Sequence, residues 1–117
     1  MRGLTTFLAC RFEVEGRMAT ATRLFAVTLS HGPRWETSQP LEGQKGWVEH
    51  ASFMDALVAE GFVVLGGPLE GASGALLIVR AQSANDIHAR LAEDPWARLD
   101  LLRTASIVPW IIRLGSV

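Results

Sequence analysis

The stretch Lys45–Gly61, KGWVEHASFMDALVAEG, runs directly into Phe62–Pro68, FVVLGGP, and these two segments decide the fold. At about 100° per residue, the apolar side chains of the first segment gather on one side of a helix: Trp47, Ala51, Met54, Leu57 and Val58. Gly61 is typical of the residue that ends a helix, and the β-favouring residues after it predict a strand over Phe62–Leu65. A core-facing helix followed by a strand is therefore expected.

His50 lies on the same predicted stripe, between Met54 and Leu57 in angle, so its ring points inward rather than to water. A titratable ring on a buried face needs a hydrogen-bonding partner. Two interpretations stay open. His50 is either a core histidine satisfied by a backbone carbonyl or by Asp94, or a group that transfers protons.

Composition bounds the size and class of the protein. With 117 residues, 49% of them hydrophobic and 20% charged, the chain is long enough for one compact core and too short for two ordinary domains. A net charge of -1 and a pI near 6.3 provide no basic face for phosphate backbones. Nucleic-acid binding is therefore disfavoured, and a small-molecule or protein partner is expected.

Cysteine usage and hydropathy point to a location. Cys10 is the single cysteine, which excludes an internal disulfide and a cysteine-rich zinc site and suits a reducing cytoplasm. No apolar run approaches the roughly 20 residues that a membrane span requires. We expect a cytoplasmic protein without membrane association.

Residues 1–21 are predicted to form an N-terminal extension, and residues 22–117 the folded domain. Arg11–Arg17 alternates charged and apolar residues without building a face that continues into the following strand. Chain termini are the usual place for loosely ordered segments. The extension is expected to be loosely held, with Met18 as an alternative initiation site.

A short apolar segment, Leu24–Leu29, predicts the first strand, which ends at Ser30-His31-Gly32-Pro33. Arg34–Lys45 then forms a polar loop of about a dozen residues, and loops of that length inside compact domains are often functional. Trp35 is the large apolar member of this loop. It either packs against the core or closes a ligand pocket as a lid.

Gly66-Gly67-Pro68 is expected to end the second strand, and a turn over residues 70–74 leads into Ala75–Arg80, which completes a hairpin. The two glycines do not open a helix and lack the GxxxxGK and GxGxxG spacings, so a phosphate-binding loop is disfavoured. They are expected instead to allow a bulge or a close backbone approach at the mouth of a cleft.

Ser83 and Asp86 have the spacing of a capping box and predict that a second helix begins there. His88 lies on this helix and is expected at the surface. The helix must end by Asp94, because Pro95 pushes the residue before it out of the helical region. An extended or turn geometry that aims the carboxylate of Asp94 is expected.

Leu101–Leu114 predicts a last strand that Pro109 interrupts, as at a sheet edge or a bulge. The element order is then β, α, β, β, α, β, the α+β arrangement of ferredoxin-like domains. Four antiparallel strands with both helices on one face leave the other face bare, and that face is expected to be apolar. Its burial against a second copy gives a two-fold homodimer with the sheets face to face.

Four motifs follow one another along the chain: His50-x-x-Phe53-Met54-x-x-Leu57-x-x-x-Gly61, Gly66-Gly67-Pro68-Leu69, Asp94-Pro95-Trp96 and Val108-Pro109-Trp110. Their order and spacing resemble the YCII-related family, from about Arg23 to Arg113. The resemblance implies a dimeric α+β barrel of ferredoxin-like subunits. It also implies a histidine and an aspartate proposed as a catalytic pair in a small cleft, and these match His50 and Asp94.

The same resemblance implies elimination or isomerisation chemistry. One relative in the family is a dehydrochlorinase that acts on a chlorinated hydroxyquinol, and muconolactone isomerases share the fold. The loop from Gly32 to Lys45 and the N-terminal extension depart from the family pattern. The shape of the pocket is therefore not carried over.

A His–Asp pair has a chemistry of its own. A carboxylate that accepts a hydrogen bond from one imidazole nitrogen fixes the tautomer and leaves the other nitrogen free to take or give a proton. We therefore expect His50 to act as general base or acid and Asp94 to orient it. No serine or cysteine is spaced for a nucleophilic triad, because Cys10 is in the extension and Ser52 lies on another helix face. The expected reaction is proton transfer on a small cyclic oxygenated substrate: elimination, dehydrochlorination or isomerisation.

In this enzyme hypothesis four further residues line the substrate pocket: His31, Gly67, Pro68 and Trp110. No cofactor is expected. A metal site on His31, His50 and Asp94 is a weaker alternative, because no HxH or HxxxH spacing supports it. The competing hypothesis is a dimeric module that binds a metabolite or a protein without turnover, with the His–Asp pair as a polar anchor in the cleft.

Overall fold

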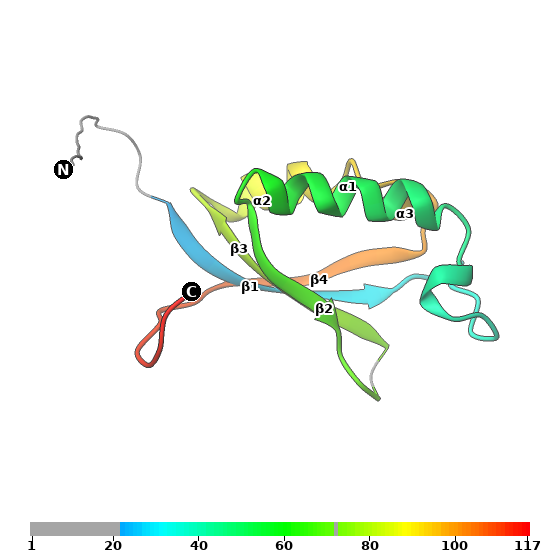
Figure 1. Cartoon of the computed structure of the whole chain (residues 1–117), viewed down its shortest axis with the longest axis horizontal. Helices are drawn as coiled ribbons and strands as arrows, with labels where there is room; N and C mark the ends of the chain where they lie inside the picture. Colours follow the sequence, from blue (N-terminus) through cyan, green and yellow to red (C-terminus); the bar gives the residue numbers. More distant parts are fainter. Residues whose placement is uncertain (1–21, 72) are drawn as a thin grey trace.

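The computed structural model describes residues 22–71 and 73–117, which form a four-stranded antiparallel sheet with the helices on one of its faces (Figure 1). The predicted loosely held extension, residues 1–21, lies outside the described residues. The elements follow in the order β1 (Arg23–His31), η1 (Leu41–Gly43), α1 (Trp47–Ala59), β2 (Val63–Pro68), β3 (Gly74–Ala81), α2 (Ala84–Leu91), α3 (Pro95–Arg98) and β4 (Leu102–Pro109). The predicted order of four strands and two helices is confirmed, with η1 and α3 as additions.

The sheet has the strand order β2-β3-β1-β4, so β1 and β3 are its centre. Alternate residues of β1 point toward the helices and are buried: Phe25, Val27 and Leu29. Their partners on β3 are Val79, Leu77 and Ala75. Residues that face each other across an antiparallel pair share a side of the sheet, so these six side chains form the floor of the core.

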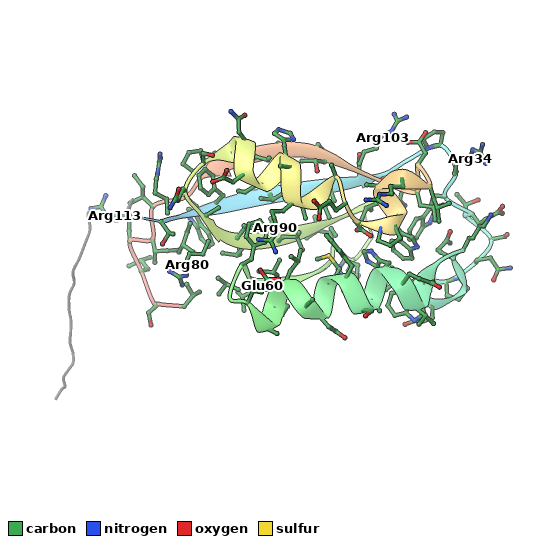
Figure 2. All side chains as sticks on the ribbon, turned by 90° about the horizontal axis from the view of Figure 1, so that it is seen from above. Arg34, Glu60, Arg80, Arg90, Arg103 and Arg113 are labelled. Carbon is green, nitrogen blue, oxygen red and sulfur yellow. The ribbon has the colours of Figure 1, made fainter. Side chains whose placement is uncertain are left out.

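The helices cover this floor. α1 lies over the β2 edge of the sheet, and α2 lies nearer β4 (Figure 2). Leu57 of α1 and two residues of α2, Ile87 and Leu91, belong to the same buried core. An ion pair between Arg90 and Glu60, 2.7 Å long, joins α2 to the end of α1 (Figure 2). Both side chains are well exposed, so the pair adds little to stability.

Two strand boundaries differ from the sequence prediction. β2 continues through Gly66-Gly67-Pro68 rather than ending before it. An edge strand tolerates Pro68, and Gly66 fits because a Cβ there would lie 2.5 Å from the Leu77 side chain. The glycines themselves pair in regular register with β3, so the bulge predicted for them is not there; the irregularity of this strand pair lies earlier, between Val63 and Leu65. β4 ends at Pro109 and does not reach Leu114, since proline cannot donate to the ladder.

The face of the sheet away from the helices is only partly apolar. The register aligns one apolar residue from each strand in a row across it: Leu65, Ile78, Ala26 and Val108. Leu65 and Val108 are more than half exposed. Polar side chains stand beside this row, because Thr28 and Ser106 are hydrogen-bonded to each other on the same face.

None of the helices in the described residues has the length and apolar character needed to cross a membrane.

Candidate active site

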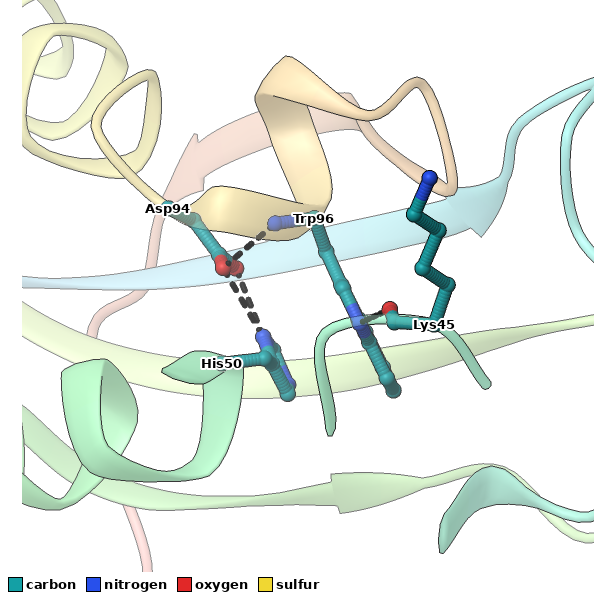
Figure 3. A network of polar contacts seen from close by, with 4 residues as sticks. All are labelled: Lys45, His50, Asp94 and Trp96. Carbon is teal, nitrogen blue, oxygen red and sulfur yellow. Dashed lines mark hydrogen bonds and ion pairs between the residues drawn. The ribbon is translucent and has the colours of Figure 1, made fainter. Parts of the chain in front are cut away.

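A buried His–Asp pair joins two segments that are distant in sequence. Nδ1 of His50, in the first turn of α1, lies 2.9 Å from both carboxylate oxygens of Asp94 (Figure 3). His50 is 9% exposed and Asp94 is 4% exposed. The expectation that the two converge is confirmed, and with it the inward position of His50.

Asp94 is placed by the short helix that follows it. Its backbone is extended, with φ -61° and ψ 130°, as Pro95 demands. It is the N-cap of α3, and its Oδ1 accepts the backbone N–H of Trp96 at 3.0 Å (Figure 3). An aspartate at the N-cap with proline at the first helical position is a recognised helix start. Cap geometry therefore aims the carboxylate at His50.

Trp96 forms the wall behind the His50 ring. The two rings are stacked, with centroids 3.8 Å apart and planes 6° apart. The indole N–H of Trp96 donates to the carbonyl oxygen of Lys45 at 2.7 Å (Figure 3). Trp96 is 1% exposed. Gly46 precedes the first residue of α1, lies against this indole and has φ 74°. A Cβ at this position would lie 3.1 Å from the Leu99 side chain. The start of α1 and the short helix α3 therefore pack around the same tryptophan.

The hydrogen bond decides the tautomer of His50. An ionised carboxylate only accepts, so Nδ1 of the neutral ring carries the proton and Nε2 carries the lone pair. Within residues 22–71 and 73–117, no protein atom is hydrogen-bonded to Nε2. This nitrogen is therefore free to exchange a proton with a ligand.

His50 lines a cavity of about 440 Å³ between α1 and the end of the β2–β3 hairpin next to its turn. Asp94 does not line it and lies behind the imidazole. The walls are mostly aromatic and aliphatic, including Trp47, Met54 and Val63. Asp55 is the single carboxylate among the described lining residues. A cavity of this size, apolar with a few polar groups, suits a small cyclic molecule.

A second imidazole lines the same cavity. His31, the last residue of β1, stacks on Trp35 with ring centroids 3.7 Å apart and planes 8° apart. Burial lowers the pKa of His31 below its ordinary value. Trp35 and Trp96 also meet in a T-shaped contact, with ring centroids 5.3 Å apart. Trp35 therefore packs against other aromatic rings and at the same time lines the cavity.

Gln44 organises the loop that carries Trp35, and sequence reasoning missed it. Its side chain is 3% exposed. Oε1 accepts the N–H of Glu36 at 3.0 Å, and Nε2 donates to the carbonyl oxygens of Glu36 at 2.8 Å and Gln39 at 3.2 Å. A single glutamine in a polar loop carries no sequence signal for such a role, because its partners are backbone groups.

The remaining predicted residues divide into two groups. Gly67 and Pro68 of β2 line the cavity with His31. Trp110 does not line it, because β4 runs antiparallel to β1 and ends at the opposite end of β1 from His31. The backbone N–H of Trp110 donates there to the carbonyl of Leu24 at 2.9 Å. His88 is exposed on α2, as predicted.

The metal alternative is not supported. In the described part of the chain, no three His, Cys, Asp or Glu side chains are grouped closely enough to hold an ion. His31 stacks on Trp35, and His50 stacks on Trp96, so the aromatic pair stands between the two imidazoles.

The profile of the YCII-related domain family matches residues 15–111. The chain belongs to this family. No curated protein sequence matches this YCII-related chain.

Among solved structures, the YCII-related chain is similar to 5-chloro-2-hydroxyhydroquinone dehydrochlorinase (TftG) from Burkholderia phenoliruptrix AC1100, in complex with 2,5-dihydroxybenzoquinone. The TM-score is 0.55 and the sequence identity 23%, over 79% of this chain and 95% of TftG. At that identity the likeness shows a shared fold.

Proposed function

We propose that the protein is a small enzyme that transfers protons on a cyclic oxygenated substrate, with His50 as general base and acid and Asp94 as the residue that orients it. The observation that carries the proposal is the free Nε2 of a cavity-lining His50 whose Nδ1 is held by a buried carboxylate. A positioned base of this kind contributes about 10²–10⁴-fold to a rate.

In an elimination, Nε2 of His50 takes a proton from the substrate. The electron pair left behind forms a new double bond, and chloride departs with the electrons of its bond to carbon. In an isomerisation, the same nitrogen returns the proton to a different atom. In both reactions the carboxylate of Asp94 stabilises the imidazolium while the proton is held.

The lining of the cavity favours acid–base over covalent chemistry. The described lining residues include no Ser, Thr, Cys or Lys, which are common covalent nucleophiles in enzymes. The relative with the same fold, TftG, is a dehydrochlorinase whose structure holds 2,5-dihydroxybenzoquinone. A small oxygenated ring is therefore the substrate class proposed here. No cofactor is part of the proposal.

The proposed assembly is a homodimer of ferredoxin-like subunits in the cytoplasm, with the open faces of the two sheets in contact. The apolar row across that face, with Leu65 and Val108 more than half exposed, supports it. Light scattering at micromolar concentration is expected to give a dimer, and Leu65→Lys or Val108→Lys a monomer. Val48→Lys, on the outside of α1, is the control. A wild-type monomer contradicts the assembly.

Turnover of a panel of halogenated hydroxyquinols and lactones tests the enzyme proposal. We expect His50→Ala to abolish turnover of the substrate found and His88→Ala, on the exposed face of α2, to leave it unchanged. Thermal unfolding is measured alongside. If His50→Ala lowers the melting temperature and leaves turnover intact, His50 is a core residue and the proposal fails.

The second candidate function is a module that binds a ring-shaped metabolite without turnover. The stacked aromatic walls favour it, because they hold a flat ligand without any proton transfer. Saturable binding with no chemical change in any ligand of the panel supports this candidate over the enzyme.

A further inference from the structure

The loop that covers the cavity is a fixed wall. Gln44 holds the backbone of Glu36 by both its N–H and its carbonyl. Glu36 follows Trp35 directly, and the N–H of Trp35 donates to the carbonyl of Gly32 at 3.1 Å. The backbone of Trp35 and of the residue after it is therefore held, and the contacts with His31 and Trp96 position the indole.

Trp35 in turn fixes the ring plane of His31. The parallel stack at 3.7 Å leaves the imidazole little freedom to tilt. Among the described residues, none is hydrogen-bonded to the ring nitrogens of His31. Because burial lowers the pKa of His31, the ring is neutral near pH 7 and offers one donor and one acceptor.

Polar groups are sparse on the walls of this cavity. Beside His31 and His50, the described lining residues include one charged side chain, Asp55, and are otherwise apolar or aromatic. The rings of Trp35 and Trp96 stand between the two imidazoles, which therefore meet a ligand at separate points.

We propose that the cavity recognises a flat ring with polar groups at two separate positions, one bonded to His50 and the other to His31, and that Gln44 is a positioning residue that presents His31 through Trp35. The ring chemistry rests on the proposed function. Two-point recognition is a property of binding, so it is measured without turnover.

Hydroquinone and phenol test the proposal, because they differ by one hydroxyl. Binding is followed by NMR through the indole N–H signals of the cavity tryptophans, with Trp110 outside the cavity as the internal reference. We expect the wild type to bind hydroquinone about 5–10-fold more tightly than phenol, as one additional hydrogen bond allows.

Two variants separate the roles. His31→Phe keeps a ring against Trp35 and removes both nitrogens, and we expect it to reduce the preference to less than about 2-fold with phenol binding unchanged. Gln44→Ala is expected to reduce the preference in the same way and to shift the His31 ring protons downfield as the stack loosens. Gln82→Ala, an exposed glutamine between β3 and α2, is the control and keeps both properties.

The proposal is overturned if the wild type shows no preference, if neither probe binds, or if the preference survives in His31→Phe. Unchanged His31 signals and an unchanged preference in Gln44→Ala overturn the positioning role. The proposed function fails in a different way. If no substrate is turned over but the wild type still prefers hydroquinone to phenol, the enzyme proposal is wrong and two-point recognition is retained.

Discussion

The imidazole of His50 and the indole of Trp96 lie face to face, 3.8 Å apart at their centroids. Asp94 fixes the ring from its Nδ1 edge, and Trp96 fixes it from its face. One short segment supplies both contacts, because Asp94 caps α3 and Trp96 is its second residue. The orientation of Nε2 toward the cavity therefore depends on how α3 is placed against α1.

Replacement of Trp96 tests this dependence. Trp96→Phe keeps an aromatic face for His50 but removes the hydrogen bond to Lys45, and we expect a loss of about 1–3 kcal/mol in the free energy of unfolding. Trp96→Ala leaves a large void and should cost about 3–5 kcal/mol. Chemical denaturation measures both. Trp110→Phe, at a partly exposed position outside the cavity, is the control. If Trp110→Phe and Trp96→Phe lose the same free energy of unfolding, Trp96 has no special role in holding α3 against the start of α1.

Asp94→Asn is expected to reverse the tautomer of His50. An amide keeps one acceptor oxygen and has an NH2 donor in place of the other, so one of the two carboxylate oxygens that lie against Nδ1 is replaced by a donor. If the oxygen stays with Trp96, the amide NH2 faces Nδ1, and the ring proton moves to Nε2. The base at the cavity is then lost, and turnover should fall about 10²–10⁴-fold.

Nitrogen-15 chemical shifts of the His50 ring report the tautomer directly. A proton that stays on Nδ1 in Asp94→Asn contradicts the mechanism of this loss. Asp100→Asn is the matched control, because Asp100 lies in the same region and pairs with the exposed Arg103. It should leave the His50 signals as they are.

The start of α1 provides a prediction about stability. Gly46 has φ 74° and lies against Leu99 and Trp96, so Gly46→Ala strains the backbone and crowds the wall of the site. We expect a loss of about 1–2 kcal/mol. Gly67→Ala is the contrast, because a Cβ there meets nothing within 4 Å; it should change the denaturation midpoint little. Similar midpoints for the two variants contradict the close fit around Gly46.

The parts of the site that sequence predicted depend on local rules. His50 follows from the helical period of the stretch around it, and the backbone of Asp94 follows from the proline after it. The start of α3 also has a local signal, aspartate before proline, but the sequence analysis predicts only the backbone of Asp94 from it and no helix. Trp110 was misplaced because β4 runs antiparallel to β1, so the end of β4 lies beside Leu24 and away from His31.

The rest depends on contacts between distant segments. The stacking of Trp96 on His50 brings together residues from α3 and α1, and Gln44 acts through backbone groups up to eight residues away. No periodicity or motif encodes such pairs. They follow only when the sheet has brought the loop, α1 and α3 to one end of the molecule.

His31 predicts how stability depends on pH. Burial lowers its pKa in the folded chain from the ordinary 6.5, which the unfolded chain keeps. As the pH falls below about 6.5, the unfolded chain binds a proton more readily than the folded chain, so the stability of the fold decreases until His31 is protonated in both. Above that pH the effect is absent. When the pH is lowered from about 7.5 to about 5.5, we expect the melting temperature of His31→Phe to fall less than that of the wild type. His88→Phe, at an exposed position, should follow the wild type, and identical pH profiles for His31→Phe and the wild type contradict the prediction.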